Sequence, residues 1–286
     1  MMQLTTSFAA AFDLTEVGAR HWRARIDDSW RGWAGPHGGV LAALTVEAAR
    51  RTAGEDIPVR ACDLHFLGRP GLGELTLRAE HHPVGRSSHV VEVRMEQQEQ
   101  TVAAATVTLG RDGESAVPAR GGRPAPDVAR PETSARFRLP TEIVPAAAHF
   151  DIRPVAGPLP LTGSDEASMT AWIALTDTAP PADTTPSTDT TPSTDTTLPL
   201  DPVTLAVLAD ALPPGIFPTL TAPIAVPTVS LSMHLHTGEF DRDSPFALVR
   251  AANAGTASGW SIDETDLWDT RGRLLATARQ SRRVLG

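Results

Sequence analysis

Three polar residues in the second half of the chain have side chains that could act together in chemistry: Asp210, Thr228 and Gln280. They supply a carboxylate, a hydroxyl and a carboxamide, each from a different predicted element. Asp210 falls in the last turn of the predicted helix 201–212, at the negative end of the helix dipole and within an apolar run. An aspartate placed there is suited to accept a proton, so we predict a general base. The alternative is a helix-end aspartate that contacts water or Thr219.

The helix that carries Asp210 has start and stop signals. Asp201 is a favoured N-cap residue, and Pro202 suits the first helical position. The pair Pro213-Pro214 cannot continue a helix. We therefore expect one helix that brings Asp210 close to its C-terminal end.

The stretch 227–236 alternates apolar and polar residues and predicts a strand. One face should close a core and consists of Val229, Leu231, Met233 and Leu235. The other face should border a crevice and consists of Thr228, Ser230, Ser232, His234 and His236. A later strand, 273–280, runs up to Gln280 on the face of Leu274, Ala276 and Ala278.

In the first half, the sequence Gly35-Pro36-His37-Gly38-Gly39 comes directly before a predicted helix over 40–51. Glycines at a helix start leave its first N–H groups open to a ligand oxygen, and the helix dipole favours negative charge there. We therefore predict His37, Gly38 and Gly39 as substrate-binding residues. The alternative is a tight turn that needs positive φ. The motif lacks the Lys-Ser/Thr ending of a phosphate-binding P-loop.

The order of elements repeats along the chain. The first helix precedes predicted strands at 59–67, 75–79, 91–96 and 101–109, which we interpret as an antiparallel meander. The second helix precedes predicted strands at 226–236, 246–252, 260–268 and 273–280. This repetition indicates the duplication of one unit made of a helix and a sheet.

Composition suggests where the units divide. We predict a first domain over residues 1–110, a Pro- and Arg-rich surface linker over 111–148, and a second domain over 149–286. Segment 12–33 is interpreted as an edge strand followed by a loop. Residues 176–199 include a repeated Thr-, Pro- and Asp-rich pattern with few apolar side chains, so we expect a disordered loop there, of which 183–197 should be dispensable.

The charge balance restricts the partners. A formal net charge of -9 with 21% charged residues argues against a nucleic-acid surface. The single cysteine, Cys62, excludes an intramolecular disulfide and is expected to be an inert buried thiol, which fits a cytoplasmic protein. Residues 1–14 lack the basic start of a signal peptide. No apolar run approaches the roughly 18 residues of a membrane helix.

Two rival motifs are disfavoured. His234 and His236 share a strand face and could hold a metal, but no spaced Cys or carboxylate nearby completes a zinc signature, so we expect no metal. In the stretch 255–259, Gly-Thr-Ala-Ser-Gly, the serine is one position too late for the Gly-x-Ser-x-Gly motif of α/β-hydrolases.

The chain resembles the acyl-CoA thioesterase II family. In the second half the resemblance lies in Phe-Asp-Ile-Arg-Pro-Val at 150–155, in 228–236, and in Leu-Ala-Thr-Ala-Arg-Gln at 275–280. In the first half it lies in Pro-His-Gly-Gly at 36–39, Phe-Leu-Gly-Arg-Pro-Gly at 66–71 and Gly-Arg-Ser at 85–87. The chain departs from the family pattern at Ser230, His234, Leu235 and Val40.

This resemblance implies an α+β fold, the double hotdog, in which two helix-wrapped antiparallel sheets join into one pseudo-dimeric chain. It implies hydrolysis of acyl-CoA thioesters by a water that Asp210, Thr228 and Gln280 orient and activate, with no cofactor. The expected partner is the acyl-CoA substrate, with neither nucleic acid nor membrane, and a dimer of double hotdogs is compatible with it.

Two alternatives stay open on the same fold. One is a non-catalytic protein that binds acyl-CoA or an acyl carrier, because a hotdog tunnel can keep its shape after losing its chemistry. The other is a hotdog enoyl-CoA hydratase, which needs an Asp/His pair and therefore requires His37 and Asp210 to lie close together.

Overall fold

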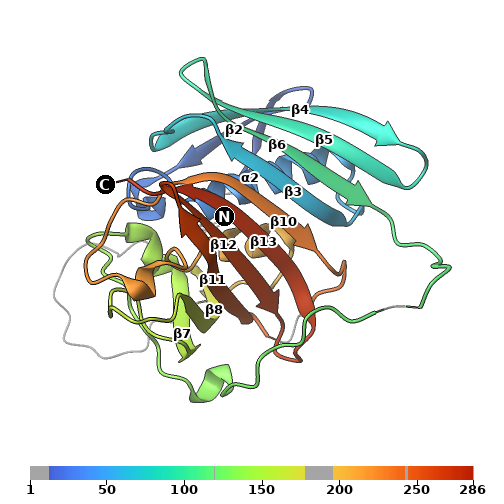
Figure 1. Cartoon of the computed structure of the whole chain (residues 1–286). Coiled ribbons are helices and arrows are strands. Elements are labelled where there is room, and N and C mark those ends of the chain that lie inside the picture. The colour runs from blue at the N-terminus through green and yellow to red at the C-terminus, as the bar shows by residue number, and fades with distance from the viewer. Residues whose placement is uncertain (1–12, 119, 178–195, 242–243, 286) are drawn as a thin grey trace.

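The computed structural model describes residues 13–118, 120–177, 196–241 and 244–285. Its strands form one antiparallel sheet in the order β1-β2-β4-β5-β6-β3-β10-β13-β12-β11-β8-β7, with the short β9 paired to β8 (Figure 1). The strands of the first half are β1 (Thr15–Gly18), β2 (His21–Ile26), β3 (Val59–Phe66), β4 (Gly73–Val84), β5 (Ser88–Gln97) and β6 (Gln100–Gly110). Those of the second half are β7 (Phe150–Ala156), β8 (Ser168–Asp177), β9 (Thr196–Thr197), β10 (Thr228–Leu235), β11 (Ala247–Ala257), β12 (Trp260–Trp268) and β13 (Leu274–Arg283).

The two halves have mirrored strand orders that meet in the centre of the sheet. Outward from the centre, the first half runs β3-β6-β5-β4-β2 and the second half runs β10-β13-β12-β11-β8. β3 and β10 pair antiparallel there, with Leu64 opposite Leu231. The predicted repetition in the order of the elements is therefore seen in the strand order. The meander is only partly right, because β3 pairs with β6 and β10 and not with β4, its successor in sequence.

Helix α2 (Gly38–Ala53) fills the space inside the first half of the sheet. It packs on β3, β4, β5 and β6 and on α3 (Pro202–Leu208), the helix of the second half. Every residue from Gly39 to Val46 is buried, as expected of a helix enclosed on all sides. Apart from the partly exposed Gly38 at its start, only its last turns reach water, where Glu47 pairs with Arg50 and Arg51.

Helix α3 is shorter than predicted. Asp201 and Thr204 form a capping box at its start, with the backbone N–H of each donating to the side chain of the other at 2.7 Å. After Leu208 the backbone tightens, because the N–H of Asp210 donates to the carbonyl three residues back, at Val207. Asp210 therefore lies just beyond the helix, and its placement in the last helical turn was wrong.

The segment predicted as a surface linker packs against the second half of the sheet. The indole N–H groups of Trp268 and Trp172 donate to the backbone carbonyls of Arg123 and Ala129, at 2.8 and 2.7 Å. Ala125 packs against the same buried apolar cluster. This part of 111–148 is thus not a free linker, because two tryptophans on the outer sheet face need both cover and hydrogen-bond acceptors. Two short 3-10 turns, η2 (Pro131–Thr133) and η3 (Pro145–His149), complete it.

The ends of the predicted disordered loop 176–199 are strand. Thr176 and Asp177 pair with Thr197 and Thr196 in the β8–β9 ladder, so disorder was wrong there. Residues 178–195 lie outside the described residues. At the start of the chain, β1 is the edge strand and β2 pairs on both sides, which corrects the single edge strand expected in 12–33.

Candidate active site

A β-bulge decides which face of the sheet Thr228 occupies. Along the β10–β13 ladder, Leu231 lies opposite Gln280 and Thr228 opposite Arg282, so β10 has one residue more than β13 between these pairs. Thr228 therefore shares a face with Leu231 and Gln280. Its predicted place beside Ser230 and the histidines was wrong, because simple alternation takes no account of an inserted residue.

Asp210 accepts hydrogen bonds from three residues, one in α2 and two in β13. Its Oδ2 accepts the backbone N–H of Gly39 at 3.1 Å, from the first turn of α2. Its Oδ1 accepts Gln280 Nε2 at 2.9 Å and Arg282 Nη2 at 3.3 Å, both from β13. The side chain is 13% exposed, so the carboxylate is largely shielded from water but can still be reached. Charged hydrogen bonds of this kind fix both the position and the rotamer of a carboxylate.

Thr228 and Gln280 complete the cluster. Thr228 Oγ1 accepts a 2.7 Å hydrogen bond from Arg282 Nη1 and lies 3.5 Å from Gln280 Oε1. Gln280 is 1% exposed and lies inside β13, which continues to Arg283, so the predicted end of this strand at Gln280 was too early. The three predicted residues Asp210, Thr228 and Gln280 are thus within one hydrogen-bonded group.

Arg282 and Asp263 belong to this group and were missed at the sequence level. Arg282 Nε lies 2.7 Å from Asp263 Oδ2, a close ion pair whose N–H is not aligned for a hydrogen bond. Both side chains are nearly inaccessible, at 9% and 3% exposure. The signal for Arg282 was its place two residues after Gln280, hence on the same strand face. For Asp263, the comparable signal was its place on the face of β12 that is directed toward the helices.

The loop that follows Asp210 is hydrogen-bonded to Asp263. The N–H of Gly215 donates to Asp263 Oδ2 at 3.1 Å, and Asn253 Nδ2 donates to Asp263 Oδ1 at 3.2 Å. A Cβ at Gly215 would lie 2.5 Å from the backbone nitrogen of Asn253, so only glycine lets this loop approach the sheet so closely. Segment 210–215 is therefore held at both ends by the Arg282–Asp263 pair.

Gly38 and Gly39 are the first two residues of α2, and close packing accounts for both. A Cβ at Gly38 would lie 2.7 Å from Asp210 Oδ2, and one at Gly39 would lie 2.6 Å from the carbonyl oxygen of Val207. Neither residue has positive φ, so the tight-turn interpretation does not apply to them. The Gly39 N–H is directed at Asp210.

His37, the N-cap residue of α2, lies close to Asp210. Burial lowers the pKa of His37, while the Asp210 carboxylate and a hydrogen bond to the backbone of Asp210 act in the opposite direction. Its Nδ1 atom is buried and has no hydrogen-bond partner among the described residues. A neutral imidazole with one unused nitrogen therefore lies beside the cluster.

The first half of the sheet has a register shift at the corresponding place, flanked by apolar residues. Val59 lies opposite Leu109 with a register shift directly after it, and Cys62 lies opposite Val107. By position in the mirrored ladders, Val59, Leu109 and Val107 correspond to Thr228, Arg282 and Gln280. All three are buried. The polar cluster is thus a property of the second half.

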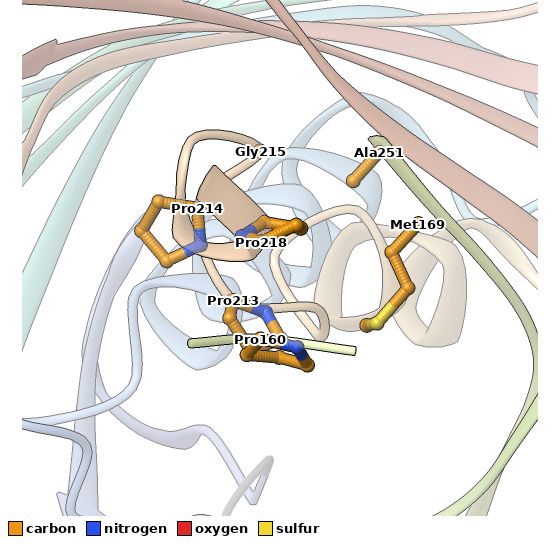
Figure 2. A pocket seen from close by; sticks show the side chains of 7 residues that line it. All are labelled: Pro160, Met169, Pro213, Pro214, Gly215, Pro218 and Ala251. Carbon is orange, nitrogen blue, oxygen red and sulfur yellow. The ribbon is translucent and has the colours of Figure 1, made fainter. Parts of the chain in front are cut away.

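A small apolar hollow lies beside the loop that follows Asp210. This hollow, beside Gly215, is lined by Pro160, Met169, Pro213, Pro214, Pro218 and Ala251, shown in Figure 2. It has no room for a water molecule. This hollow therefore offers no space for a substrate.

The other chemically capable residues lie apart from the cluster. His236 Nε2 contacts Thr277 Oγ1 at 3.1 Å, and the neighbouring His234 is exposed on β10. In the parts of the chain that the structure describes, no three His, Cys, Asp or Glu side chains are grouped as a metal would require. Cys62 is buried, and burial raises the pKa of its thiol to about 12, as expected of an inert cysteine.

Sequence comparison settles the family. The acyl-CoA thioesterase N-terminal domain matches residues 26–110, and the acyl-CoA thioesterase C-terminal domain matches residues 119–284. The chain belongs to the acyl-CoA thioesterase family. It is accordingly a thioester hydrolase, with an acyl-CoA as the substrate that the family implies. A search of curated proteins by sequence found no relative.

Solved structures agree on the fold. A conserved protein with a hot dog fold from Alicyclobacillus acidocaldarius is 22% identical, with 99% of each chain covered and a TM-score of 0.79. The tesB protein of Mycobacterium avium subs paratuberculosis is 17% identical, with 97% of this chain and 98% of that one covered and a TM-score of 0.73. An acyl-CoA thioesterase II from Mycobacterium marinum is 16% identical, with 98% of each covered and a TM-score of 0.69. Within the described residues, no helix is long and apolar enough to span a membrane.

Proposed function

We propose that this thioesterase hydrolyses acyl-CoA with a water molecule that Asp210, Thr228 and Gln280 hold and activate. The observation that carries the proposal is the meeting of these three side chains in one largely buried, hydrogen-bonded group. They come from the turn that follows α3 and from the neighbouring strands β10 and β13. A carboxylate, a hydroxyl and a carboxamide are together sufficient to accept a proton from water and to orient its oxygen.

The carboxylate of Asp210 keeps capacity for a water. A carboxylate has about four lone-pair sites, and its neighbours use three of them: two at Oδ1, from Gln280 and Arg282, and one at Oδ2, from Gly39. The fourth site, at Oδ2, can accept a hydrogen bond from water. Gln280 Nε2 has a second hydrogen, which can hold the oxygen of that water.

The reaction follows from this arrangement. The water oxygen attacks the carbonyl carbon of the thioester, and one of its protons passes to Asp210. The tetrahedral intermediate collapses with cleavage of the carbon–sulfur bond, and the CoA thiolate leaves. Asp210 returns its proton to the sulfur, which gives the free acid and CoA and restores the carboxylate.

The negative charge on the former carbonyl oxygen needs N–H donors. The first turn of α2 supplies backbone N–H groups with no carbonyl four residues back, at the positive end of the helix dipole. Gly39 already donates to Asp210. We assign the oxyanion to the N–H of Gly38, with His37 beside it as a further contact to the substrate.

The fold supports a pseudo-dimeric double hotdog, with domains over 1–110 and 149–286 joined by segment 111–148. The mirrored strand orders are what support this division. Because buried apolar residues take the corresponding positions in the first half, we assign the chemistry to the second half and only the start of α2 to the first half. Association into a dimer of double hotdogs stays a prediction.

The test is a panel of acyl-CoA substrates of increasing chain length, assayed by release of the free thiol. Turnover of at least one of them, lost in Asp210→Asn, is the expected result. Bound acyl-CoA that persists unhydrolysed for hours on the wild-type protein would instead identify a non-catalytic binding protein.

A second candidate function is favoured by the proximity of His37 and Asp210. An Asp/His pair could add water across the double bond of an enoyl-CoA, with the neutral imidazole and the carboxylate sharing the proton transfers. Hydration of crotonyl-CoA, followed by the loss of absorbance of its conjugated thioester, tests this directly. If it occurs without thiol release, the hydratase replaces the hydrolase.

A further inference from the structure

Arg282 contacts three side chains of the candidate site at once, one through each of its guanidinium nitrogens. Nη1 donates to Thr228, Nη2 donates to Asp210, and Nε is paired with Asp263. We infer that Arg282 is a positioning residue of the thioesterase, anchored by Asp263 and holding the general base and the hydroxyl in their reactive geometry. This inference rests on the proposed function and deepens it.

The anchor is rigid before Arg282 is considered. Asp263 is 3% exposed and is itself held by the N–H of Gly215 and by Asn253. Its carboxylate therefore has a fixed place on β12. Arg282 Nε lies 2.7 Å from this fixed carboxylate, while Nη1 and Nη2 donate to Thr228 and Asp210, so the planar guanidinium is held at all three nitrogens.

The bond to Thr228 determines what the hydroxyl can do. A hydroxyl has one proton to donate and two lone pairs. Because Arg282 Nη1 donates to Oγ1 at 2.7 Å, one lone pair is occupied and the proton is directed elsewhere, to Gln280 or to a water beside it. Without Arg282 the hydroxyl could rotate and accept a hydrogen bond from the water, which reverses its role.

The bond to Asp210 closes a ring. Asp210 is joined to Gly215 by the chain, Gly215 to Asp263 by a hydrogen bond, Asp263 to Arg282 by an ion pair, and Arg282 back to Asp210. Asp210 lies beyond the end of α3, and its carboxylate is held by Gly39 and Gln280 as well as by Arg282. The ring adds a link between this carboxylate and the far end of segment 210–215. A displacement of about 1 Å at a reacting group can lower turnover by about 10²-fold.

Lysine cannot take over this role. A lysine at 282 would keep the positive charge, but its single ammonium cannot reach Thr228, Asp210 and Asp263 in the geometry of a planar guanidinium. The variant R282K therefore separates charge from positioning. If charge alone matters, R282K should resemble the wild type; if positioning matters, it should be nearly as impaired as R282A.

The experiment measures kcat and KM for the best acyl-CoA substrate in the wild type, R282K, R282A and the control R283Q. Arg283 is the next residue on β13, and its guanidinium contacts the carbonyl of Gly259 and the ring of Trp260, away from the cluster. We expect kcat to fall by about 10²-fold in R282K and R282A with KM within about threefold, and R283Q to match the wild type.

Chemical rescue adds a readout that a purely structural role would not give. Added guanidinium, far below the concentrations that unfold proteins, should restore part of the kcat of R282A and none of that of R282K, whose side chain occupies the space. In an Asp210→Asn background, R282K should cause little additional loss, because the residue it positions is already disabled.

The results that overturn the inference are equally specific. R282K with a kcat within twofold of the wild type would do so, as would R282A that guanidinium does not rescue. If R282A fails to fold because Asp263 is left buried and unpaired, R282Q/D263N removes both charges together. A folded R282Q/D263N protein with wild-type kcat would also overturn it. A wild type inactive on every thioester would overturn the proposed function and this inference together.

Discussion

The side-chain amide of Gln280 donates a 2.9 Å hydrogen bond from Nε2 to Oδ1 of Asp210, across 70 positions of sequence. The amide therefore faces the carboxylate with its nitrogen, and its oxygen is turned toward Thr228. This orientation assigns Asp210 the role of acceptor in the cluster, as a general base requires.

Asp210→Asn keeps the volume of the side chain and removes the base. We expect kcat to fall by about 10²- to 10⁴-fold while acyl-CoA still binds, because a positioned general base contributes about that much. Thiol release measures the first effect and titration with a non-hydrolysable acyl-CoA thioether measures the second. Wild-type turnover in this variant would leave Asp210 as a helix-end residue.

The same variant should also lower stability. If Asp210 were strained by its surroundings, the Asp210→Asn protein would be at least as stable as the wild type. Asp210 instead accepts three hydrogen bonds, one of them from Arg282, which the substitution weakens. We therefore expect a loss of about 1–3 kcal/mol in the free energy of unfolding, measured by urea denaturation. An unchanged midpoint of urea denaturation would mean that these hydrogen bonds contribute little to the free energy of unfolding.

Thr228→Val and Gln280→Ala should lower kcat less than Asp210→Asn does. Both residues orient the water and neither takes up the proton, so we expect about tenfold losses. Thr228→Ser is the matched control, since it keeps the hydroxyl that Arg282 contacts. A Thr228→Ser protein as poor as Thr228→Val would show that the methyl group, and not the hydroxyl, is what matters.

Alanine at the two helix-start glycines should have different effects. At Gly39 the new Cβ meets the backbone of Val207, which cannot move without separating α2 from α3, so we expect a loss of about 1–3 kcal/mol in stability. At Gly38 it meets the Asp210 carboxylate, a side chain that can be displaced without moving backbone but only by breaking its hydrogen bonds. Gly38→Ala should therefore fold and lose activity. The melting temperature and kcat of Gly38→Ala and Gly39→Ala check this prediction. Equal melting temperatures for the two variants would contradict it.

His149 should make stability depend on pH. It is buried and stacked on Trp30 with ring centroids 3.9 Å apart, and burial lowers its pKa to about 4. Between pH 6.5 and 4 the unfolded chain binds a proton at this residue that the folded chain does not. Stability is therefore present in full above pH 6.5 and falls by roughly 2–4 kcal/mol as the pH drops to 4.

The control for this prediction is His149→Phe, which keeps an aromatic ring for the stack and removes the titration. Its free energy of unfolding should change less between pH 6.5 and 4 than that of the wild type, measured by denaturant titration at each pH. Identical pH profiles would assign the effect to other groups, of which His37, with a pKa also lowered by burial, is the first.

The sequence predicted elements better than it predicted exact positions. Periodicity located both helices and the strands that follow them, because burial of one face leaves its mark on every second or fourth residue. It could not show that Thr228 lies before a bulge, since the extra residue is determined by pairing with β13. It also could not show where α3 ends, because that depends on how the chain turns to meet the sheet.

Only part of the candidate site was predicted from the sequence, because side-chain contacts also depend on how the strands pair. Asp210, Thr228 and Gln280 came from a family resemblance, and the structure places them together. Arg282 and Asp263 had no motif to point to them, because a buried ion pair between adjacent strands is a matter of register. Sequence distance carries no information about such a pair.

The apolar counterparts of the cluster in the first half have an evolutionary consequence. In a dimer of identical chains, each substitution enters both subunits, so a change that improves packing at one bulge also removes the polar groups at the other. Joining the two units in one chain lifts that constraint. Val59, Val107 and Leu109 could then be selected for packing alone, while Thr228, Gln280 and Arg282 could be selected for chemistry alone.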